Sequence, residues 1–249
     1  MLNVISDKFF LSDFLGLSET DLEFVALFKQ FAFQEVPKDL PFSLDERRYY
    51  LATLAVLVGS QGLEAYKEIL PVALDNGVKA VEVKELLYQA VAYLGLSRVY
   101  AFFVPTNTIF TNQGISLPLA SQKNTKNQTR LEAGEEAQNA IFGDQMKGFA
   151  TKGEPDVRHI NKWLVDNCFG DYYTRSSLDY AERELLTFCY LYSQGGCEPQ
   201  LKGHIAANLR LGNDKTLLIA VISACIPYIG YPRTLNALSC INEVVNAQQ

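Results

Sequence analysis

One thiol and one imidazole stand close together in the segment from Gly195 to His204. Cys197 and His204 are seven residues apart, and in a helix this spacing places both side chains on one face. An imidazole titrates near neutral pH and a thiolate is a nucleophile, so the pair could perform acid–base or thiol chemistry. A second cysteine four residues before the histidine would permit a disulfide relay, but Gln200 stands there. The segment therefore predicts acid–base chemistry at a helix start.

The elements that must position these side chains are predicted to be helices. The run from Leu217 to Ala224 is almost entirely apolar, as expected of a helix buried on all sides, and 178–191 carries a broad apolar stripe. Further helices are expected over 130–142 and 156–167. Because no run alternates like a strand, we expect an all-α fold.

Glycine and capping residues predict where these helices end. Gly212 can end one helix, and Asn213 or Asp214 can cap the next by accepting hydrogen bonds from its free N–H groups. Gly230 repeats the stop signal, and Pro232 suits a first helical turn, where no N–H is needed. Gly77 and Gly95 occupy corresponding places in the first half of the chain.

An internal repeat organises the chain. The segment Tyr93–Arg98 aligns with Tyr228–Arg233, and at the same separation Gly77 aligns with Gly212 and Arg48 with Arg183. Ser43-Leu44-Asp45 matches Ser177-Leu178-Asp179 after a slip of one residue. We therefore expect a tandem duplication: a first repeat over 1–104, a polar crossover loop over 105–129, and a second repeat over 130–249.

The amino-acid composition limits the classes of binding partner and the cellular compartment that we expect. The 249 residues are 48% hydrophobic, and a net charge of −6 leaves no basic face for a nucleic acid. No apolar run is long enough to span a membrane, and no signal peptide is recognisable, so a cytoplasmic protein is expected. Five scattered cysteines resemble neither a disulfide framework nor a zinc site, and neither a metal nor a cofactor is expected.

Several segments together resemble the carboxymuconolactone decarboxylase family, which is related to the alkylhydroperoxidase D-like proteins. They are Glu132–Gly143, Tyr172–Asp179, Arg183–Thr187, Gly196–His204, Gly212–Asp214 and Pro227–Leu238. The first half resembles a diverged copy in which Ile69 stands where the second has His204. The resemblance implies two helical domains related by a pseudo-twofold axis, with one working pocket per chain. It also implies a homo-oligomer, for which a trimer of pseudo-dimers is one possibility.

His204 is the expected proton-transfer residue, with Glu184 on the preceding helix as the group that orients it. A packed core histidine and a solvated carboxylate are the alternatives. Cys197, near a helix N-terminus, is a candidate nucleophile or a structural thiol. Without a local partner, Cys197 would need an external thiol or Cys189 or Cys225.

Two arginines and one tyrosine are candidates for substrate binding. Arg175 and Arg233 could bind the carboxylate of a carboxylated lactone through paired hydrogen bonds, although Arg233 could also be structural. Tyr228, which the repeat matches with Tyr93, could contact substrate or pack in the core.

Three functions remain open. The first is a cofactor-independent lyase that decarboxylates a small cyclic carboxylate through proton transfer by His204. The second is a peroxiredoxin-type, thiol-dependent peroxide reductase that uses Cys197. The third is a non-catalytic protein that binds a small molecule on the same scaffold.

Overall fold

The computed structural model describes residues 16–40 and 44–247, and the regular elements in these residues are all helical. The all-α prediction is confirmed. The N-terminal segment, which suggested no signal peptide, and Ser43 of the repeat lie outside the described residues. The order of the longer helices is α2 (Leu22–Gln30), α4 (Glu46–Gly59), α5 (Leu63–Asp75), α6 (Ala80–Leu94), α7 (Leu96–Asn112), α8 (Arg130–Phe142), α10 (Tyr180–Gln194), α11 (Glu198–Arg210), α12 (Lys215–Ala224) and α14 (Tyr231–Asn246).

Shorter elements join the longer ones. A π-helical turn η2 (Phe31–Glu35) links α2 to α3 (Val36–Asp39), and α13 (Ile226–Ile229) separates α12 from α14. After α8, two 3₁₀ turns, η3 (Asp144–Met146) and η4 (Phe149–Thr151), lead to α9 (Arg158–Trp163) and the π-helical η5 (Leu164–Tyr173). The helix expected over 156–167 therefore continues with a wider turn as far as Tyr173.

Helices α4 and α5 of the first half share features with α10 and α11 of the second. Asp45 and Asp179 cap α4 and α10 in the same way, each accepting a hydrogen bond from the N–H three residues later. Arg48 and Glu182 are each the third residue of their helix, and the expected match of Arg48 with Arg183 stays a prediction. Ile69 and His204 are each the seventh residue of their helix, α5 and α11. That the two halves superpose about a pseudo-twofold axis stays a prediction.

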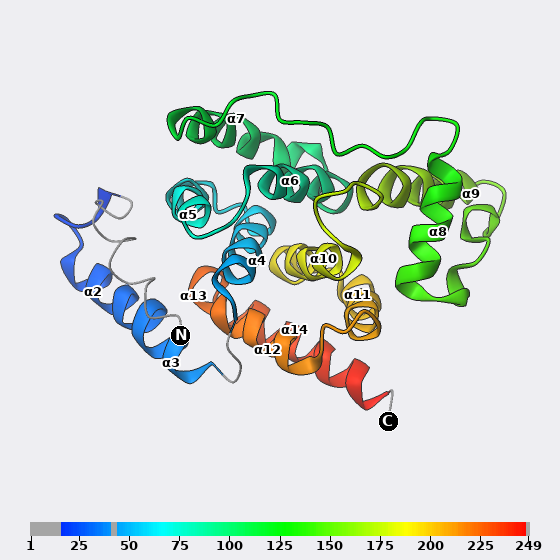
Figure 1. The fold of residues 1–249 in the computed structure, drawn as a ribbon. Helices are drawn as coiled ribbons and strands as arrows, with labels where there is room; N and C mark the ends of the chain where they lie inside the picture. The colour runs from blue at the N-terminus through cyan, green and yellow to red at the C-terminus, as the bar shows by residue number, and fades with distance from the viewer. Residues whose placement is uncertain (1–15, 41–43, 248–249) are drawn as a thin grey trace.

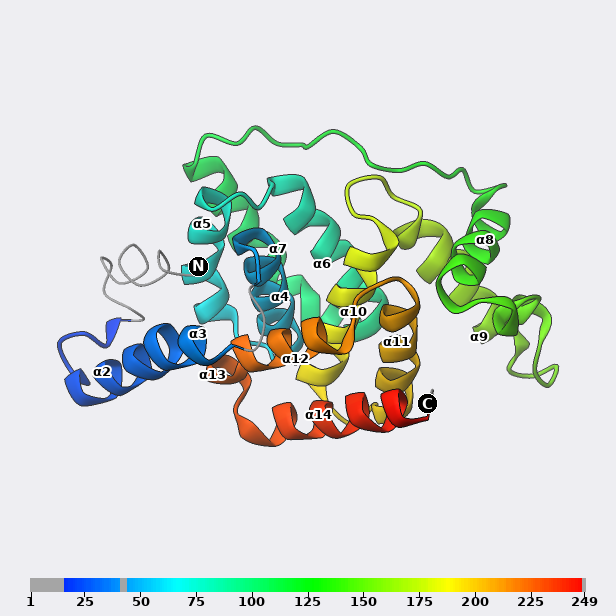
Figure 2. The same ribbon diagram turned by 60° about the horizontal axis from the view of Figure 1, so that its bottom comes forward.

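The centre of the molecule is the crossing of α4 and α10 (Figure 1). A Cβ atom on Gly59 would lie 1.9 Å from Oγ of Ser193, so only glycine allows this approach of the two backbones. Buried apolar residues of both halves form one core around the crossing. Helices α2 and α3 lie at one end of the molecule and α8 and α9 at the other (Figures 1 and 2).

The crossover between the halves is shorter than the sequence indicated. Helix α7 continues through Pro105 to Asn112, so the irregular segment spans 113–129. It runs along one edge of the molecule from α7 to α8 (Figures 1 and 2). Its far end is tied to the second half, because the Asn124 amide donates to the carbonyl of Thr174 and the Thr125 hydroxyl donates to that of Gly170.

No helix in the described residues is long and apolar enough to cross a membrane.

Candidate functional site

The imidazole of His204 and the carboxylate of Glu184 meet between α10 and α11. Nδ1 of His204 lies 2.6 Å from Oε2 of Glu184. The Glu184 side chain is fully buried, whereas that of His204 remains 12% exposed. A carboxylate at Nδ1 orients the ring and leaves Nε2 as the nitrogen that can exchange a proton with a ligand. The sequence-based pairing of these two residues agrees with this geometry.

A chain of hydroxyl groups holds the other oxygen of Glu184. The hydroxyl of Tyr173 donates to Oε1 of Glu184 at 2.8 Å, and it lies 2.7 Å from the hydroxyls of both Tyr93 and Thr187. Gln89 of α6 in turn donates to the Thr187 hydroxyl. Burial raises the pKa of both Tyr93 and Tyr173 well above the usual range. Both phenols are therefore neutral hydrogen-bonding groups at physiological pH.

Aromatic rings enclose His204 on two sides. The rings of Tyr93 and Phe142 each stand edge to face with the imidazole, with centroids 5.4 Å away. Tyr93 belongs to α6 in the first half of the chain, and Phe142 ends α8. Because α8 and η5 pack closely through Gly134 and Gly170, whose Cβ atoms would meet the opposite backbone at 2.1 Å, Phe142 is held rigidly beside the ring.

The backbone at the site is fixed by buried amides. The Asn208 amide donates to the carbonyl oxygens of Glu184 and His204 and therefore links α10 to α11. Asn213 donates to the Asn208 side chain and to the carbonyl of Ala181. These hydrogen bonds keep the two helices in the register that brings the imidazole to the carboxylate.

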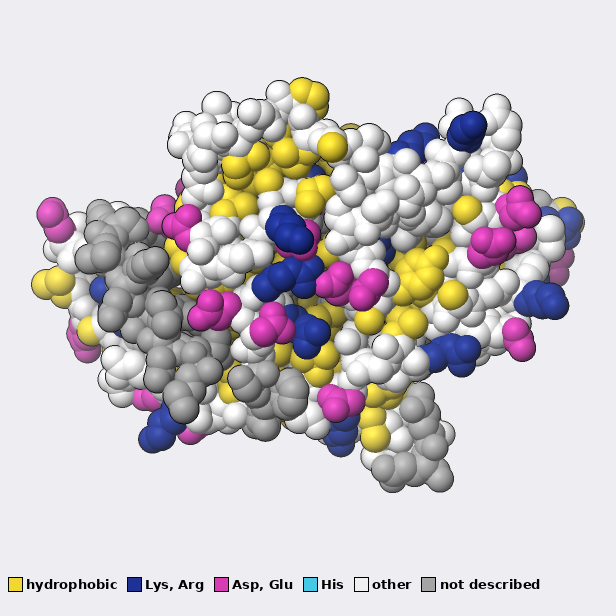
Figure 3. Space-filling model, in the orientation of Figure 1, with side chains coloured by type: hydrophobic (Ala, Val, Ile, Leu, Met, Phe, Trp, Pro, Cys, Tyr) yellow, Lys and Arg dark blue, Asp and Glu magenta, His cyan; other side chains and the backbone are white. Residues whose placement is uncertain are grey.

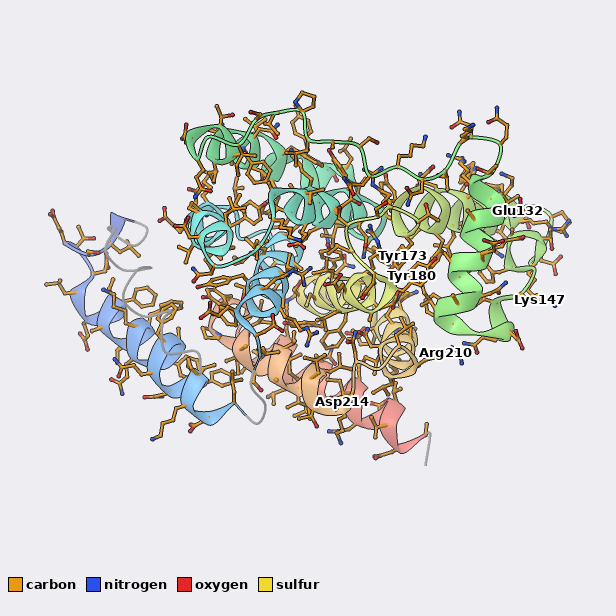
Figure 4. The ribbon with its side chains drawn as sticks, viewed as in Figure 1. Glu132, Lys147, Tyr173, Tyr180, Arg210 and Asp214 are labelled. Carbon is orange, nitrogen blue, oxygen red and sulfur yellow. The ribbon has the colours of Figure 1, made fainter. Side chains whose placement is uncertain are left out.

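A groove of about 500 Å³ lies beside the His204 helix, between α8 and α11. Its walls include Phe142, which touches the imidazole, together with Gly203 and Ala206 on α11. Apolar side chains reach the surface in this region (Figure 3). Arg210, at the end of α11, supplies a cation at the rim, and Figure 4 shows it facing the α8 side. His204 itself does not line the groove; Phe142, which stands edge to face with the imidazole, lies between the two.

Cys197 occupies the N-cap position of α11, and its surroundings favour the neutral thiol. Its sulfur is a donor to the carbonyl of Leu191 at 3.3 Å. Burial is the largest influence and raises its pKa, although a hydrogen bond from Gln194 and the charge of Arg233 act in the opposite direction. Cys189 and Cys225, which were considered as distant partners, are both buried free thiols.

The three expected substrate-binding residues do not contact His204. Nε of Arg175 is bound by both carboxylate oxygens of Glu85, at 2.9 and 2.8 Å. The exposed Arg233 lies over Gly195, where a Cβ atom would be 2.1 Å from its Nη1. Tyr228 packs against Tyr49 of α4 and edge to face against Phe28 of α2. Of the expected residues, the structure brings His204 and Glu184 into direct contact, and it places Arg233 near Cys197 rather than near the imidazole.

Four residues that the sequence analysis missed belong to the site. Thr187 could have been found, since it follows Glu184 by three residues on the same predicted helix. The others lie on different elements, and no local pattern marks them; they are Tyr93, Phe142 and Tyr173.

In the part of the chain that the structure describes, no cluster of histidine, cysteine or carboxylate side chains could hold a metal ion. Residues 159–243 match the model of the carboxymuconolactone decarboxylase family, and this segment contains Glu184, Cys197 and His204. No curated protein matches the chain.

Proposed function

We propose, from the match of residues 159–243 to the model of the carboxymuconolactone decarboxylase family, that the protein is a cofactor-independent lyase that decarboxylates a small cyclic carboxylate. The observation that carries the proposal is the 2.6 Å contact between Nδ1 of His204 and the buried carboxylate of Glu184. It supports a general acid–base role, because it orients the ring and stabilises the imidazolium formed when Nε2 accepts a proton.

The proposed reaction breaks the bond between the ring carbon and the carboxylate carbon. Carbon dioxide leaves, and the electron pair remains on the ring carbon as an enolate conjugated with the lactone carbonyl. The imidazolium of His204 then delivers the proton from Nε2 to that carbon, so that one proton is taken up for each carbon dioxide released. The hydroxyls of Thr187 and Tyr173 hold the Glu184 carboxylate in place during this proton transfer.

The groove between α8 and α11 is the proposed substrate site, and the proposal requires that the bound substrate reach His204 past the ring of Phe142, which separates the imidazole from the groove. Arg210 at its rim would attract the anionic substrate, and Phe142 and Ala207 in its wall would remove water from the carboxylate that is lost. In this proposal Arg210 makes the contact with the anionic substrate that was expected of Arg175 and Arg233.

Replacing His204 with Gln tests the proposal. With a panel of γ-lactone carboxylates as substrates, the wild-type protein is expected to release carbon dioxide, and H204Q should lose at least about a hundredfold in kcat/KM. The chain offers a matched control in H159Q, because His159 is an exposed histidine on α9 whose ring stands edge to face with that of Trp163. H159Q should retain the wild-type rate.

Two outcomes would contradict the lyase proposal. One is decarboxylation that proceeds at the wild-type rate in H204Q. The other is the absence of carbon dioxide release across the panel, together with peroxide consumption that requires a dithiol donor and disappears in C197S.

The peroxide reductase remains the second candidate because Cys197 is the cysteine, among the described residues, that is not buried. Its raised pKa and its hydrogen bond to the Leu191 carbonyl favour the lyase. A ligand that binds without either reaction would favour the non-catalytic binding protein.

A further inference from the structure

A second cavity, of about 530 Å³, lies away from His204, between the N-terminal half of α6, α7 and the crossover segment. Residues 117–122 of the crossover cover one side. Two cationic side chains, Lys84 from α6 and Arg175 from the loop after η5, line it together with Tyr88 and Asn107. The family model begins at residue 159, so α6, α7 and the crossover lie outside the matched region.

Lys84 is a buried ammonium group with no carboxylate partner among the described residues. The residue is 8% exposed, and its Nζ donates to the side-chain oxygen of Asn107. The rings of Phe103 and Phe110 lie 5.7 and 5.8 Å from the nitrogen. Burial lowers the pKa of Lys84. An amide oxygen and two ring faces compensate a buried positive charge less well than a carboxylate does.

Arg175 presents unused donors to the same cavity. Its Nε is occupied by Glu85, and its guanidinium lies 5.3 Å from the centroid of the Tyr88 ring. No residue that the structure describes forms a hydrogen bond with Nη1 or Nη2 of Arg175. These two nitrogens form one edge of the planar guanidinium, which matches the two oxygens of a carboxylate.

The charges around the cavity do not balance. Glu85 is 1% exposed and is shared by Arg175 and Arg183, whose Nη2 lies 3.1 Å from its Oε2. Lys84 adds a third positive charge against this single carboxylate. A site with excess positive charge and low exposure favours an anion that supplies the missing charge in place of water.

We propose that this cavity binds a small organic carboxylate, with its carboxylate group between Nζ of Lys84 and the terminal nitrogens of Arg175. The ring of Tyr88 and the side chains of Val81, Leu117 and Leu119 contact its apolar body. A cavity of this volume accommodates a molecule the size of a substituted aromatic acid. The site is separate from the groove beside His204, so it does not depend on the lyase proposal.

Calorimetric titration with benzoate tests the proposal, with benzamide as the neutral probe of the same shape and inorganic phosphate as the alternative anion. Wild-type protein should bind benzoate at least about tenfold more tightly than benzamide or phosphate. K84M should lose at least about tenfold in benzoate affinity while remaining folded, because methionine fills the same space without a charge to bury. K147M removes an exposed lysine at the far end of the molecule and should bind like the wild type (Figure 4).

A second variant separates this cavity from the groove. H204Q should bind benzoate with the wild-type affinity, because His204 does not line the cavity. Loss of benzoate binding in H204Q, equal benzoate affinity in K84M and the wild type, or tighter binding of phosphate than of benzoate would each overturn the proposal. No benzoate binding by the wild-type protein at about 10 mM would also overturn it.

Discussion

Glu184 is the residue on which the proposed chemistry depends most after His204, although it does not touch the substrate in the proposed reaction. Its two oxygens are divided between the imidazole and the Tyr173 hydroxyl. A side chain with this role is a positioning residue, and its effect should be expressed only through the histidine that it orients.

E184Q should therefore lower kcat by about tenfold or more while leaving KM little changed. Because the two residues act as one unit, the double variant E184Q/H204Q should be no slower than H204Q alone. The measurement is kcat for the wild type, E184Q, H204Q and the double variant. Independent, additive losses would assign Glu184 a role in folding rather than in orienting the ring.

The reactivity of the Cys197 thiol should depend on pH, which gives a second prediction for a single residue. Burial raises its pKa above the ordinary thiol value, so the reactive thiolate is scarce at neutral pH and becomes abundant only as the pH rises through that higher value. Alkylation by iodoacetamide, followed by mass spectrometry, should be slow at pH 7 and should accelerate continuously above about pH 9. A rate that is already maximal near pH 7 would support the peroxide reductase.

The residue scale also shows what local sequence can and cannot predict. Glu184 and His204 lie on successive helices whose caps and stops are visible in the sequence, so their meeting could be anticipated. Arg175 could not be assigned its partner, because Glu85 lies 90 positions earlier and reaches it only through the packing of α6 on the second half. For the same reason Tyr93, which also lies on α6, was absent from the expected site.

At the scale of elements, the approach of α4 to α10 depends on Gly59. G59A should destabilise the fold by about 1–3 kcal/mol, because the new methyl group meets Ser193 and the nearby carbonyl of Tyr190. G203A on α11 is the matched control: no atom lies within 4 Å of its new methyl group, and alanine favours the helix, so stability should rise by about 0.5–1 kcal/mol. Urea denaturation measures both. A G59A protein as stable as the wild type would show that the crossing has room to relax.

The elements themselves were predicted where their signals are local. The helix expected over 130–142 has the same bounds as α8, and Asp214, one of the two expected capping residues, caps α12. The crossover was predicted to begin too early, because Pro105 and the polar residues after it indicate a loop. Phe102, Thr106 and Phe110 are nevertheless buried along one face of α7, and this packing continues the helix through the proline.

At the scale of the whole molecule, assembly remains a prediction, and the surface suggests where to test it. Exposed apolar side chains occupy the first and fifth positions of both α7 and α14: Leu96 and Tyr100 on one helix, Tyr231 and Leu235 on the other. We expect Y100E/L235E to reduce the mass of the wild-type oligomer, measured by light scattering after size-exclusion chromatography. A wild-type protein with the mass of the single 27.8 kDa chain would contradict the expectation of a homo-oligomer.

The joining of α4–α7 and α10–α14 in one polypeptide has a consequence for how the molecule can evolve. In an assembly of identical subunits every mutation appears in each copy, so a change that suits one pocket is imposed on the others. Here each position is encoded once. The seventh residue of α5 can be the buried Ile69 while the seventh residue of α11 remains His204, and selection can act on stability in one half and on chemistry in the other.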